Sequence, residues 1–564
     1  MTRTVLFAAL ASVSLAACAT TPAPRTENAP SMVEVQILAI NDFHGNLETP
    51  QSPTRYLDNG TEQSARLGGA SALAATLQLL RRENTVTVAA GDLIGASPLV
   101  SSLFLDEPSI SALSTMGLDI AAVGNHEFDR GIAELRRIQN GGCEQHTRRE
   151  PCAVEPFMGA GFRYLAANVV DENTTTLFPG TELRRFGDVV IGFVGMTLEG
   201  TPSLVAAQAT EGYAFLDEAS TANAAARALL ADGADTVVLL IHEGGDVDPR
   251  FNIEGCPGLS GPIVPIIEAL DPAISVVVSG HTHQAYVCNV ATSQGSEVLL
   301  TSGGRYGGFV TDITMMIDPA ANRVTALEAR NVPVDGSAGE DAGVAAHVAR
   351  YAEAAGPVAN RAVGSITDSG ERGEDCGDRP ADGLIADAYQ AQASAAMDAP
   401  VDLALVNSGG VRTDLSGAAD GVLTFGELAA MAPFGNSVLV LEMTGAEISA
   451  VLEQQFCAEN GAIGVCDSII VPSASLAYRV DLTRPLGQNV VDLMLNGEPI
   501  DPAATYRLAT NNFLAGGGDG FTLFTQASTI ANTGFDIDGL EAYVARGDLS
   551  VPVCGRVRGI APVD

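Results

Sequence analysis

The sequence predicts a two-domain protein of the α/β class, and three observations support this class. The chain has 564 residues, which is too long for one ordinary hydrophobic core. From Val35 onward, strand-like apolar runs alternate with helical stretches, as in βα units whose helices cover both faces of a sheet. Between about Asp335 and Val358 a polar segment and an Ala-rich helix interrupt this alternation, and we place the domain junction there.

The N-terminus has the pattern of an export signal. Arg3 precedes an apolar run, and Leu15-Ala16-Ala17-Cys18 has the small residues of a cleavage site. The same tetrapeptide resembles a bacterial lipobox, so we expect residues 1–18 to be a lipoprotein signal peptide with Cys18 lipidated. Plain secretion is the alternative. Residues 19–34 contain prolines among small polar residues and predict a flexible tether.

The charge of the chain restricts its partners. Asp and Glu total 68 against 30 Lys and Arg, which gives a formal charge of −38. Such a chain repels nucleic-acid polymers and anionic membranes, so we expect membrane contact only through the N-terminal lipid. A small phosphorylated ligand is compatible, because metal ions and a few Arg reverse the field locally. We expect a periplasmic or cell-envelope protein anchored to the outer membrane; the oligomeric state is not predicted.

The cysteine count fits an exported protein. Apart from Cys18 the chain has eight cysteines, and an even number in an exported chain indicates disulfides. Two of the candidate pairs would each close a short loop, and the other two join the cysteines that remain. The sequence leaves the connectivity open; the candidates are Cys143 with Cys152, Cys457 with Cys466, Cys256 with Cys288, and Cys376 with Cys554.

The expected elements follow in chain order. We expect a first domain at 35–335, a linker helix within 336–359 and a second domain at 360–564. Apolar residues at helical spacing predict helices at 67–82, 132–138, 219–230, 344–355 and 384–395. We expect Gly356-Pro357 to end the fourth of these helices. Apolar runs predict strands at 37–40, 86–90, 120–123, 237–241, 276–279, 298–301, 311–313, 401–407, 438–443 and 506–510.

Residues that can bind metal ions follow five of these strands. Because ligands collect at the carboxyl ends of strands in α/β sheets, we expect their side chains to form one rim. Carboxylate, amide and imidazole donors together suit Mn, Fe, Co or Zn better than Ca. Two such ions would polarise a phosphoryl oxygen and generate a hydroxide nucleophile. The candidate ligands are Asp42, His44, Asp92, Asn125, His242, His281 and His283.

One of the strand-end motifs, Gly124-Asn125-His126-Glu127, also contains a candidate catalytic group. His126 directly follows the ligand Asn125, so we expect it to point elsewhere. Asp129 can hold one imidazole nitrogen and leave the other to face a phosphoryl group or its leaving oxygen. A structural role is the alternative for any single His, but five of the seven His lie in these motifs. Glu127 has no predicted role beyond structure.

The second domain carries a candidate substrate site. The motif Asn407-Ser408-Gly409-Gly410-Val411-Arg412 follows a strand, and its glycines let the backbone and Arg412 approach an anion. Phe434 and Phe513 each stand in a polar loop with Gly. A loop Phe is most often part of a core. Two such rings can instead hold a nucleobase, since stacking contributes about 1–3 kcal/mol for any base.

The motifs, in this order, resemble the calcineurin-like metallophosphoesterases, specifically the secreted 5′-nucleotidase branch with its periplasmic UDP-sugar hydrolases and ecto-5′-nucleotidase. The resemblance covers nearly everything from Val35 to Cys554. It implies a four-layer αββα sandwich, a linker helix and a smaller α/β nucleotide-binding domain. His126 and Asp129 match the family's catalytic dyad. The resemblance also implies two divalent ions that share Asp92, one held by Asp42, His44 and His283, the other by Asn125, His242 and His281.

In the second domain the resemblance implies contacts to the base and the ribose. Phe434 and Phe513 would stack the base between them. Asn436 would contact the edge of the base, and Asp519 would accept hydrogen bonds from the ribose hydroxyls. The substrate would then span the two domains, and the resemblance implies a rotation of the domains about the linker.

The resemblance also implies a phosphate contact in the second domain. Arg412, the last residue of the motif that begins at Asn407, would bind the phosphate. A second cation would be Arg379 or Arg372. The chain departs from the family at Asp382-Gly383, where related proteins often carry an Asn-rich turn with neighbouring Arg. The second Arg contact is therefore open.

The expected function is metal-dependent hydrolysis of phosphate esters of nucleotides outside the cytoplasm, nucleoside di- and triphosphates included. Three alternatives use the same site on another bond: a UDP-sugar, a cyclic nucleotide or a thiosulfate ester. The two loop Phe favour a nucleotide over the sulfur compound. An alternative of another class is a nucleotide-binding lipoprotein without catalysis, which a missing ligand would support, yet every ligand position is filled.

Overall fold

A computed structural model gives the fold. It describes residues 1–2, 32–366, 377–415, 421–459, 462–466, 468–547, 549 and 555–560. In the described part of the chain, no helix is long and apolar enough to cross a membrane. The predictions that fall outside the described residues are the export signal with Cys18, most of the tether, and Arg372, Cys376 and Cys554.

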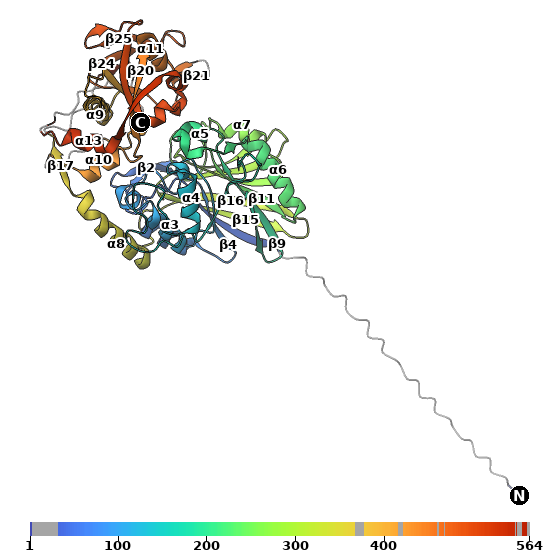
Figure 1. The fold of residues 1–564 in the computed structure, drawn as a ribbon. Helices are drawn as coiled ribbons and strands as arrows, with labels where there is room; N and C mark the ends of the chain where they lie inside the picture. Colours follow the sequence, from blue (N-terminus) through green and yellow to red (C-terminus); the bar gives the residue numbers. More distant parts are fainter. Residues whose placement is uncertain are drawn as a thin grey trace.

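The first domain contains a six-stranded mixed sheet (Figure 1). Its order is β16 (Arg323–Pro333), β15 (Phe309–Asp318), β1 (Val33–Ile40), β4 (Thr85–Ala90), β5 (Ile120–Ala122) and β6 (Arg163–Leu165). The last four strands are parallel, and β15 and β16 are antiparallel to their neighbours. The carboxyl ends of β1, β4 and β5 therefore meet at one edge.

A second six-stranded sheet belongs to the same domain. Its order is β13 (Ala285–Ala291), β14 (Glu297–Gly303), β12 (Ile274–Ser279), β11 (Thr236–His242), β9 (Val189–Thr197) and β8 (Thr181–Phe186). Its four central strands are parallel, and both edge strands are antiparallel. Strand β11 is buried along its whole length, as expected for a parallel strand covered on both faces.

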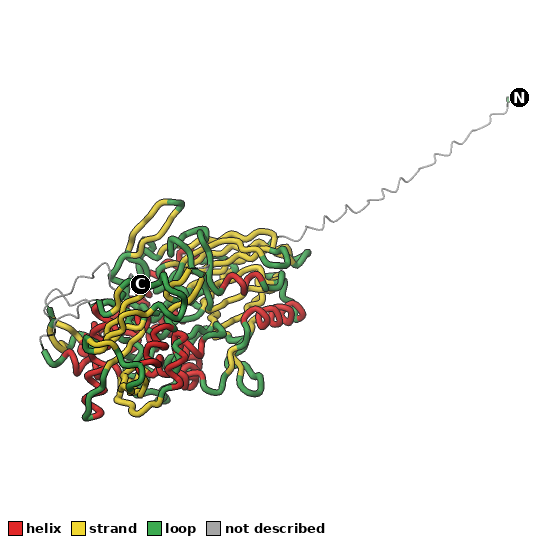
Figure 2. The backbone as a smooth tube through the Cα atoms, turned by 90° about the horizontal axis from the view of Figure 1, so that it is seen from above, coloured by secondary structure: helices red, strands yellow, loops and turns green. Residues whose placement is uncertain are grey.

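The two sheets pack face to face, and helices cover both outer faces. Apolar side chains fill the space between the sheets, with Ile37 and Val88 on one side and Phe193 and Leu240 on the other. In Figure 2 the strands of this domain run side by side with helices outside them. The four-layer αββα arrangement is confirmed. The covering helices are α1 (Ala70–Leu80), α3 (Glu107–Thr115) and α4 (Gly131–Asn140) on the first sheet, and α6 (Glu218–Ala231) and α7 (Ile263–Glu268) on the second.

Helix α8 (Ala342–Ala359) joins the domains and packs against α1 and α3 of the first domain. Asp341 begins it by accepting a hydrogen bond from the N–H of Val344. The expectation that Gly356-Pro357 ends the helix is wrong. Pro357 lies in the last turn, where its missing N–H removes only one hydrogen bond, and the N–H of Asn360 still donates to the Gly356 carbonyl.

The second domain is built on a five-stranded sheet with a smaller sheet beside it. The larger sheet has the order β23 (Ile470–Pro472), β18 (Leu403–Asn407), β27 (Thr505–Asn511), β20 (Ser437–Thr444) and β28 (Ser528–Phe535). The smaller has the order β26 (Glu498–Pro499), β25 (Val490–Leu495), β24 (Leu476–Val480) and β29 (Val557–Arg558). Their core is shared with α9 (Pro380–Met397), α10 (Phe425–Met431), α11 (Gly445–Glu453) and α13 (Asp536–Val544).

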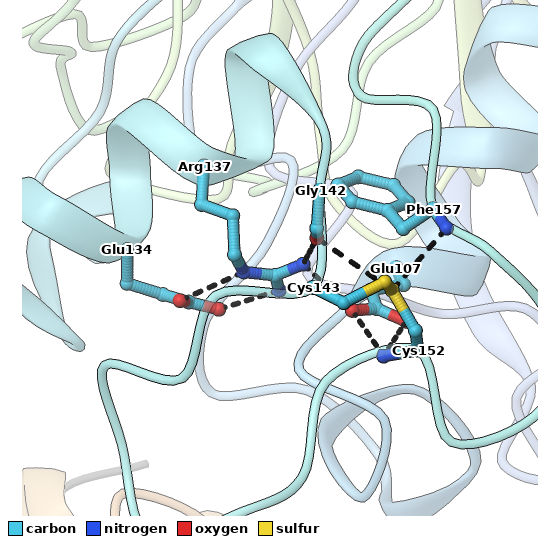
Figure 3. The surroundings of a disulfide bond; sticks show 7 residues. All are labelled: Glu107, Glu134, Arg137, Gly142, Cys143, Cys152 and Phe157. Atoms are coloured by element: carbon cyan, nitrogen blue, oxygen red, sulfur yellow. Dashed lines mark hydrogen bonds and ion pairs between the residues drawn. A yellow bond between two sulfur atoms is a disulfide. The ribbon is translucent and has the colours of Figure 1, made fainter.

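Two disulfides join described residues, Cys143–Cys152 (Figure 3) and Cys256–Cys288. The candidate pairing of Cys457 with Cys466 is wrong, because these two residues are not joined to each other. In the hairpin of β21 (Phe456–Glu459) and β22 (Ala462–Val465), Cys457 lies opposite Gly464. Cys466 is thus a diagonal neighbour at about 7–8 Å, which is beyond the usual reach of a disulfide.

Candidate metal centre and substrate cavity

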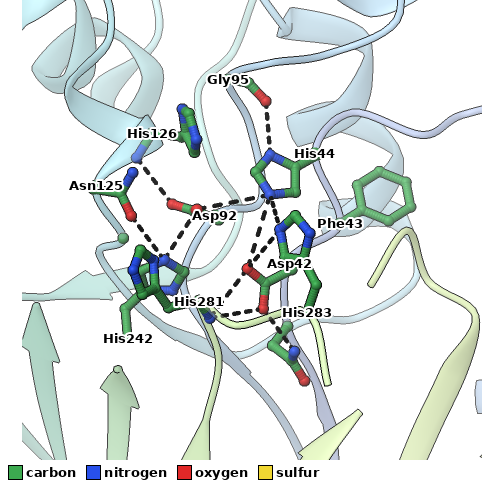
Figure 4. Close-up of polar contacts among 12 residues, drawn as sticks. Asp42, Phe43, His44, Asp92, Gly95, Asn125, His126, His242, His281 and His283 are labelled. Carbon is green, nitrogen blue, oxygen red and sulfur yellow. Dashed lines mark hydrogen bonds and ion pairs between the residues drawn. The ribbon is translucent and has the colours of Figure 1, made fainter. Parts of the chain in front are cut away.

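The predicted metal ligands lie together at the carboxyl ends of strands from both sheets (Figure 4). Five of them have left-handed φ angles, from 47° to 71°. This backbone conformation costs a residue with a Cβ about 1–3 kcal/mol and persists only where the surroundings impose it. Each such turn redirects the chain just after a strand, so that the side chain faces the rim. The five residues are Asp42, His44, Asp92, His281 and His283.

A first group of donor atoms comes from Asp42, His44 and His283. Nε2 of His44 lies 3.0 Å from Nε2 of His283 and 3.8 Å from Oδ1 of Asp42. Nε2 of His283 lies 3.5 Å from the same oxygen. Atoms bound to one Zn-like ion lie about 2.0–2.2 Å from it, and hence about 3–4 Å from one another. These three donors therefore suit a single ion.

A second group comes from Asp92, His242 and His281, whose donor atoms lie within 4.8 Å of one another. Oδ2 of Asp92 lies 3.0 Å from Nε2 of His242 and 3.7 Å from Nε2 of His44. Oδ1 of Asn125 lies 3.1 Å from Nε2 of His242. Asp92 therefore stands between the two groups and can bridge two ions.

Hydrogen bonds orient the two buried imidazoles. Nδ1 of His44 donates to the Gly95 carbonyl at 2.9 Å, and Nδ1 of His242 donates to the Ala90 carbonyl at 2.8 Å. A carbonyl only accepts, so in the neutral form of each ring Nε2 presents its lone pair to the donor group. Burial lowers the pKa of His242, but the charge of Asp92 outweighs it and raises the pKa to about 10. The field at this position favours a cation, so the residues fit a divalent metal ion.

His126 lies beside the donor groups and is held by Asp129. Its Nδ1 is 2.9 Å from Oδ2 of Asp129, and its backbone N–H donates to Oδ1 of Asp92. Burial lowers the pKa of His126, but the charges of Asp129 and Asp92 outweigh it and raise the pKa above its usual value. The protonated form is therefore favoured, as a proton donor requires. A ring nitrogen of His126 also lies within 4.8 Å of donor atoms of His44 and Asp92.

A cavity between the two domains adjoins these groups. It brings together His126, Asp129, Asn125 and His281 with every predicted substrate contact among the described residues except Arg379. Its lining from the second domain includes Asn407, Arg412, Phe434, Asn436, Phe513 and Asp519.

Phe434 and Arg412 connect the second domain to the catalytic candidate. The Phe434 ring stacks on His126 with 5.7 Å between centroids and 16° between planes. The Arg412 guanidinium carbon lies 5.5 Å from the centroid of Phe434. Burial lowers the pKa of His281 to about 3, and the charges of His242 and Arg412 contribute to this shift. The charge of Arg412 thus acts on His281, one of the candidate metal ligands.

Arg379 is the predicted contact that the structure does not bring into the cavity. Its guanidinium donates to Asp382 at 2.7 Å and to the carbonyls of Ser408 and Val411 at 2.7 and 2.8 Å. Arg379 therefore braces the loop that carries Arg412 instead of facing the cavity. The carboxylate that binds Arg379 is that of Asp382, where the sequence departs from the family pattern.

Two family models match the chain. Residues 35–285 match the calcineurin-like phosphoesterase domain, and residues 356–526 match the 5′-nucleotidase C-terminal domain. The chain belongs to the 5′-nucleotidase family. Its two domains are those of 5′-nucleotidase-type metallophosphohydrolases, and the first of these folds implies divalent metal ions.

Several known proteins resemble the chain over most of its length. It is 29% identical to the cell wall protein Lmo0130 of Listeria monocytogenes over 557 residues, 91% of this chain and 67% of that protein. It is 26% identical to the NAD 5′-nucleotidase of Haemophilus influenzae over 567 residues, 87% and 86% of the two chains. Another relative is much longer, and the chain spans 37% of its length. The solved structure of a 5′-nucleotidase precursor from Thermus thermophilus shares the fold, with a TM-score of 0.71 and 24% identity over 93% of this chain and 99% of that one.

Glu127 has a definite place in this 5′-nucleotidase-family site that sequence reasoning missed. Its carboxylate accepts hydrogen bonds from the backbone N–H groups of Asp92, Leu93 and Gly124, at 2.7 to 3.0 Å. The hydroxyl of Tyr164 donates to it as well. Glu127 therefore joins the loop of Asp92 to the loop of His126. In the sequence, only the position of Glu127 next to His126 could have suggested that it links these two loops.

Further lining residues were missed because they belong to no motif. Leu204, Val205 and Ala206 reach the cavity from the first domain. Ser468 lines it from the second domain, where its hydroxyl accepts a hydrogen bond from the N–H of Gly409 at 3.0 Å. Only the folded chain brings these segments to the cavity.

Replacing Asp536 by Asn is expected to change the pH dependence of stability. Burial raises the pKa of Asp536 to about 7, whereas an unfolded Asp titrates near 3.9. The carboxyl therefore contributes least to stability above pH 7, and its contribution is lost progressively as pH rises from about 4 to 7. Asn does not ionise, so it removes this pH-dependent loss in the free energy of unfolding, which is about 4 kcal/mol at most. Chemical unfolding at pH 5 and pH 8 measures the effect.

The variant should gain stability relative to the parent chain as pH rises, because only the parent carboxyl must ionise while buried. Asp538→Asn is the matched control, since Asp538 lies on the same helix with an exposed side chain. A constant difference between Asp536→Asn and the parent chain across this pH range would contradict the prediction.

Proposed function

We propose that the protein hydrolyses phosphate esters of nucleotides outside the cytoplasm, with two divalent ions at the rim. The main support is the cavity that joins the metal-binding side chains to Phe434, Phe513 and Arg412. A metal centre beside aromatic loops and a cation suits a phosphorylated ligand that carries a base. A NAD 5′-nucleotidase and a cell wall protein among the relatives support the nucleotide and the extracytoplasmic location. The proposal includes the domain bounds given above and a lipid on Cys18.

In this proposal the rim residues divide into two ligand sets. When bound, two divalent ions would neutralise charge on the phosphoryl oxygens and lower the pKa of the attacking water. Asp92 belongs to both sets, because its carboxylate lies between His44 and His242. The identity of the ions is expected to be Mn, Zn, Co or Fe. The sets are Asp42, His44, Asp92 and His283 for one ion, and Asp92, Asn125, His242 and His281 for the other.

The remaining side chains bind the substrate and move a proton. His126, held through Nδ1 by Asp129, would donate the proton on Nε2 to the leaving oxygen of the ribose. Arg412, the last residue of the Asn407 motif, would bind a phosphoryl oxygen.

Base and ribose contacts belong to the loops of the second domain. Phe434 and Phe513 would hold the base, with Asn436 at its edge. Asp519 would accept hydrogen bonds from the ribose hydroxyls, and Asn407 holds its carboxylate at 2.8 Å. In this proposal the second domain selects the substrate and the first domain cleaves it, because the side chains of both domains line one cavity.

Metal removal is the direct test. Phosphate release from AMP, ATP, UDP-glucose and a cyclic nucleotide should be measured with EDTA and after addition of Mn, Co or Zn. We expect release from AMP to fall by about 10²-fold or more in EDTA, because the ions stabilise the transition-state charge, and to return with one of the three metals.

The pattern across the four substrates separates the alternatives. Preference for UDP-glucose or the cyclic nucleotide over AMP would move the proposal to another bond on the same site. Binding of AMP without metal-dependent release from any of the four compounds would refute the enzyme and leave a nucleotide-binding lipoprotein.

A further inference from the structure

A second cavity adjoins the substrate cavity and has no role in the proposed reaction. It shares Asp129, Ala206 and Phe434 with the substrate cavity. Its volume is about 440 Å³, within the range of small-ligand sites. Both domains line it: the first through the loop between Cys143 and Cys152, the second through Phe535 and the loop of Phe434.

The charge around this cavity is opposite to that of the chain. The protein has a formal charge of −38 and only 30 basic residues, yet three Arg and one His line the cavity. Three of these four belong to the disulfide-closed loop. The four basic residues that line the cavity are Arg130, His146, Arg148 and Arg149.

Arg149 differs from Arg130 and Arg148 because it forms no direct ion pair with a carboxylate of the described residues. Arg130 pairs with Asp106 at 2.5 Å, and Arg148 pairs with Asp538 at 2.9 Å. Arg149 donates to the backbone carbonyl of Ser102, and no carboxylate of the described residues forms an ion pair with it. Burial lowers the pKa of Arg149 to about 10, and the charges of Arg130 and Arg148 act in the same direction, whereas the charge of Asp106 opposes the shift without cancelling it. An anion would therefore be stabilised here.

The loop that carries Arg149 is held in place before any ligand arrives (Figure 3). The Cys143–Cys152 disulfide closes it. Both carboxylate oxygens of Glu107 accept a hydrogen bond from the backbone N–H of Cys152, at 3.0 and 3.1 Å. Arg137 binds Glu107 at 2.7 Å and the Gly142 carbonyl at 2.9 Å. A preorganised loop binds a ligand without an added cost of ordering.

We propose that this cavity is a subsite for a phosphate group, with Arg149 as its principal cation and Arg130 and Arg148 beside it. The forked guanidinium matches the oxygens of a phosphate. The phosphate has two possible sources. One is a second phosphate group on a nucleotide whose reacting phosphate lies at the rim; this source rests on the proposed function. The other is free inorganic phosphate.

Binding of pyrophosphate and of inorganic phosphate, measured by calorimetry in EDTA, tests the subsite without turnover. Chelation removes metal ions from the rim, so the comparison of variants isolates Arg149. Arg149→Gln should weaken binding by about tenfold or more, the loss expected for a charged hydrogen bond. Arg227→Gln is the matched control, because it makes the same charge change at an exposed position on α6. Equal affinity in all three proteins, or no binding by the parent chain, would overturn the proposal.

Kinetics with AMP and ADP distinguish the two sources. If the second phosphate of a nucleotide binds here, Arg149→Gln raises KM for ADP and leaves KM for AMP unchanged. If free phosphate binds here, the variant changes the response of AMP turnover to added phosphate and treats ADP and AMP alike. Arg149→Met, which keeps the packing of the side-chain stem, should show the same losses if Arg149→Gln is unstable. A parent chain that releases no phosphate from any nucleotide sinks the proposed function, while calorimetry still decides the subsite.

Discussion

His126→Ala is expected to lower kcat for AMP by roughly 10²–10⁴-fold, the contribution of a positioned proton donor. Its imidazole is held by Asp129 at 2.9 Å, and its pKa is raised by the Asp129 and Asp92 charges against the effect of burial. Ala removes the proton donor and leaves every predicted ligand in place. Turnover of AMP and the metal content of the same sample should be measured together.

His347→Ala is the matched control, because His347 contacts the Pro108 carbonyl away from the rim and should leave turnover near that of the parent chain. Near-normal turnover of His126→Ala would remove His126 from the mechanism. If His126→Ala loses metal together with turnover, His126 is a metal ligand instead. The metal content is worth measuring because a ring nitrogen of His126 lies close to donor atoms of His44 and Asp92.

Gly124→Ala is expected to lower kcat/KM by about 10²-fold or more, although no ligand is replaced. A Cβ at Gly124 would lie 2.1 Å from Oδ1 of Asp92 and 2.5 Å from its backbone nitrogen. The Asp92 carboxylate, which is the proposed bridge between two ions, must therefore move, and a displacement of about 1 Å at a reacting site costs about 10²-fold. Gly124 lies outside the left-handed φ region, so the effect is purely steric. Steady-state kinetics with and without added metal measure it.

Gly464→Ala makes the same change where a Cβ meets nothing within 4 Å, and it should leave kcat/KM unchanged. Excess metal should restore part of the activity of Gly124→Ala if the carboxylate has lost affinity for the ions. Full activity of Gly124→Ala without added metal would show that Asp92 does not need its present position.

The strand ends were predictable because their signals are local. A buried parallel strand appears in the sequence as a continuous apolar run, and the polar residue that follows it marks the carboxyl end. Ile37 to Ile40 before Asp42, and Val237 to Ile241 before His242, are examples, and both runs lie in the expected strands β1 and β11. The helices at 219–230 and 384–395 were predictable for a similar reason, since each has its own apolar spacing.

Two of the predictions that the structure did not confirm concern which partner a side chain meets. Cys457 and Cys466 are close in sequence, but the register of β21 and β22 sets them diagonally. Arg379 is basic and near a substrate motif, yet Asp382 and two carbonyls of the Arg412 loop hold its guanidinium. Neither strand register nor the choice among hydrogen-bond partners is encoded in a short window of sequence.

The sequence by itself determined the α/β class, the strand ends that carry the candidate ligands, and the pairing of His126 with Asp129, because apolar runs and short spacings act through neighbouring residues. Only the tertiary structure decided that Asp92 stands between two donor groups, that Glu127 ties its loop to that of His126, and that Phe434 stacks on His126 across the domains. These contacts depend on how two sheets and a second domain pack. Packing is decided by the whole buried surface and not by any one segment.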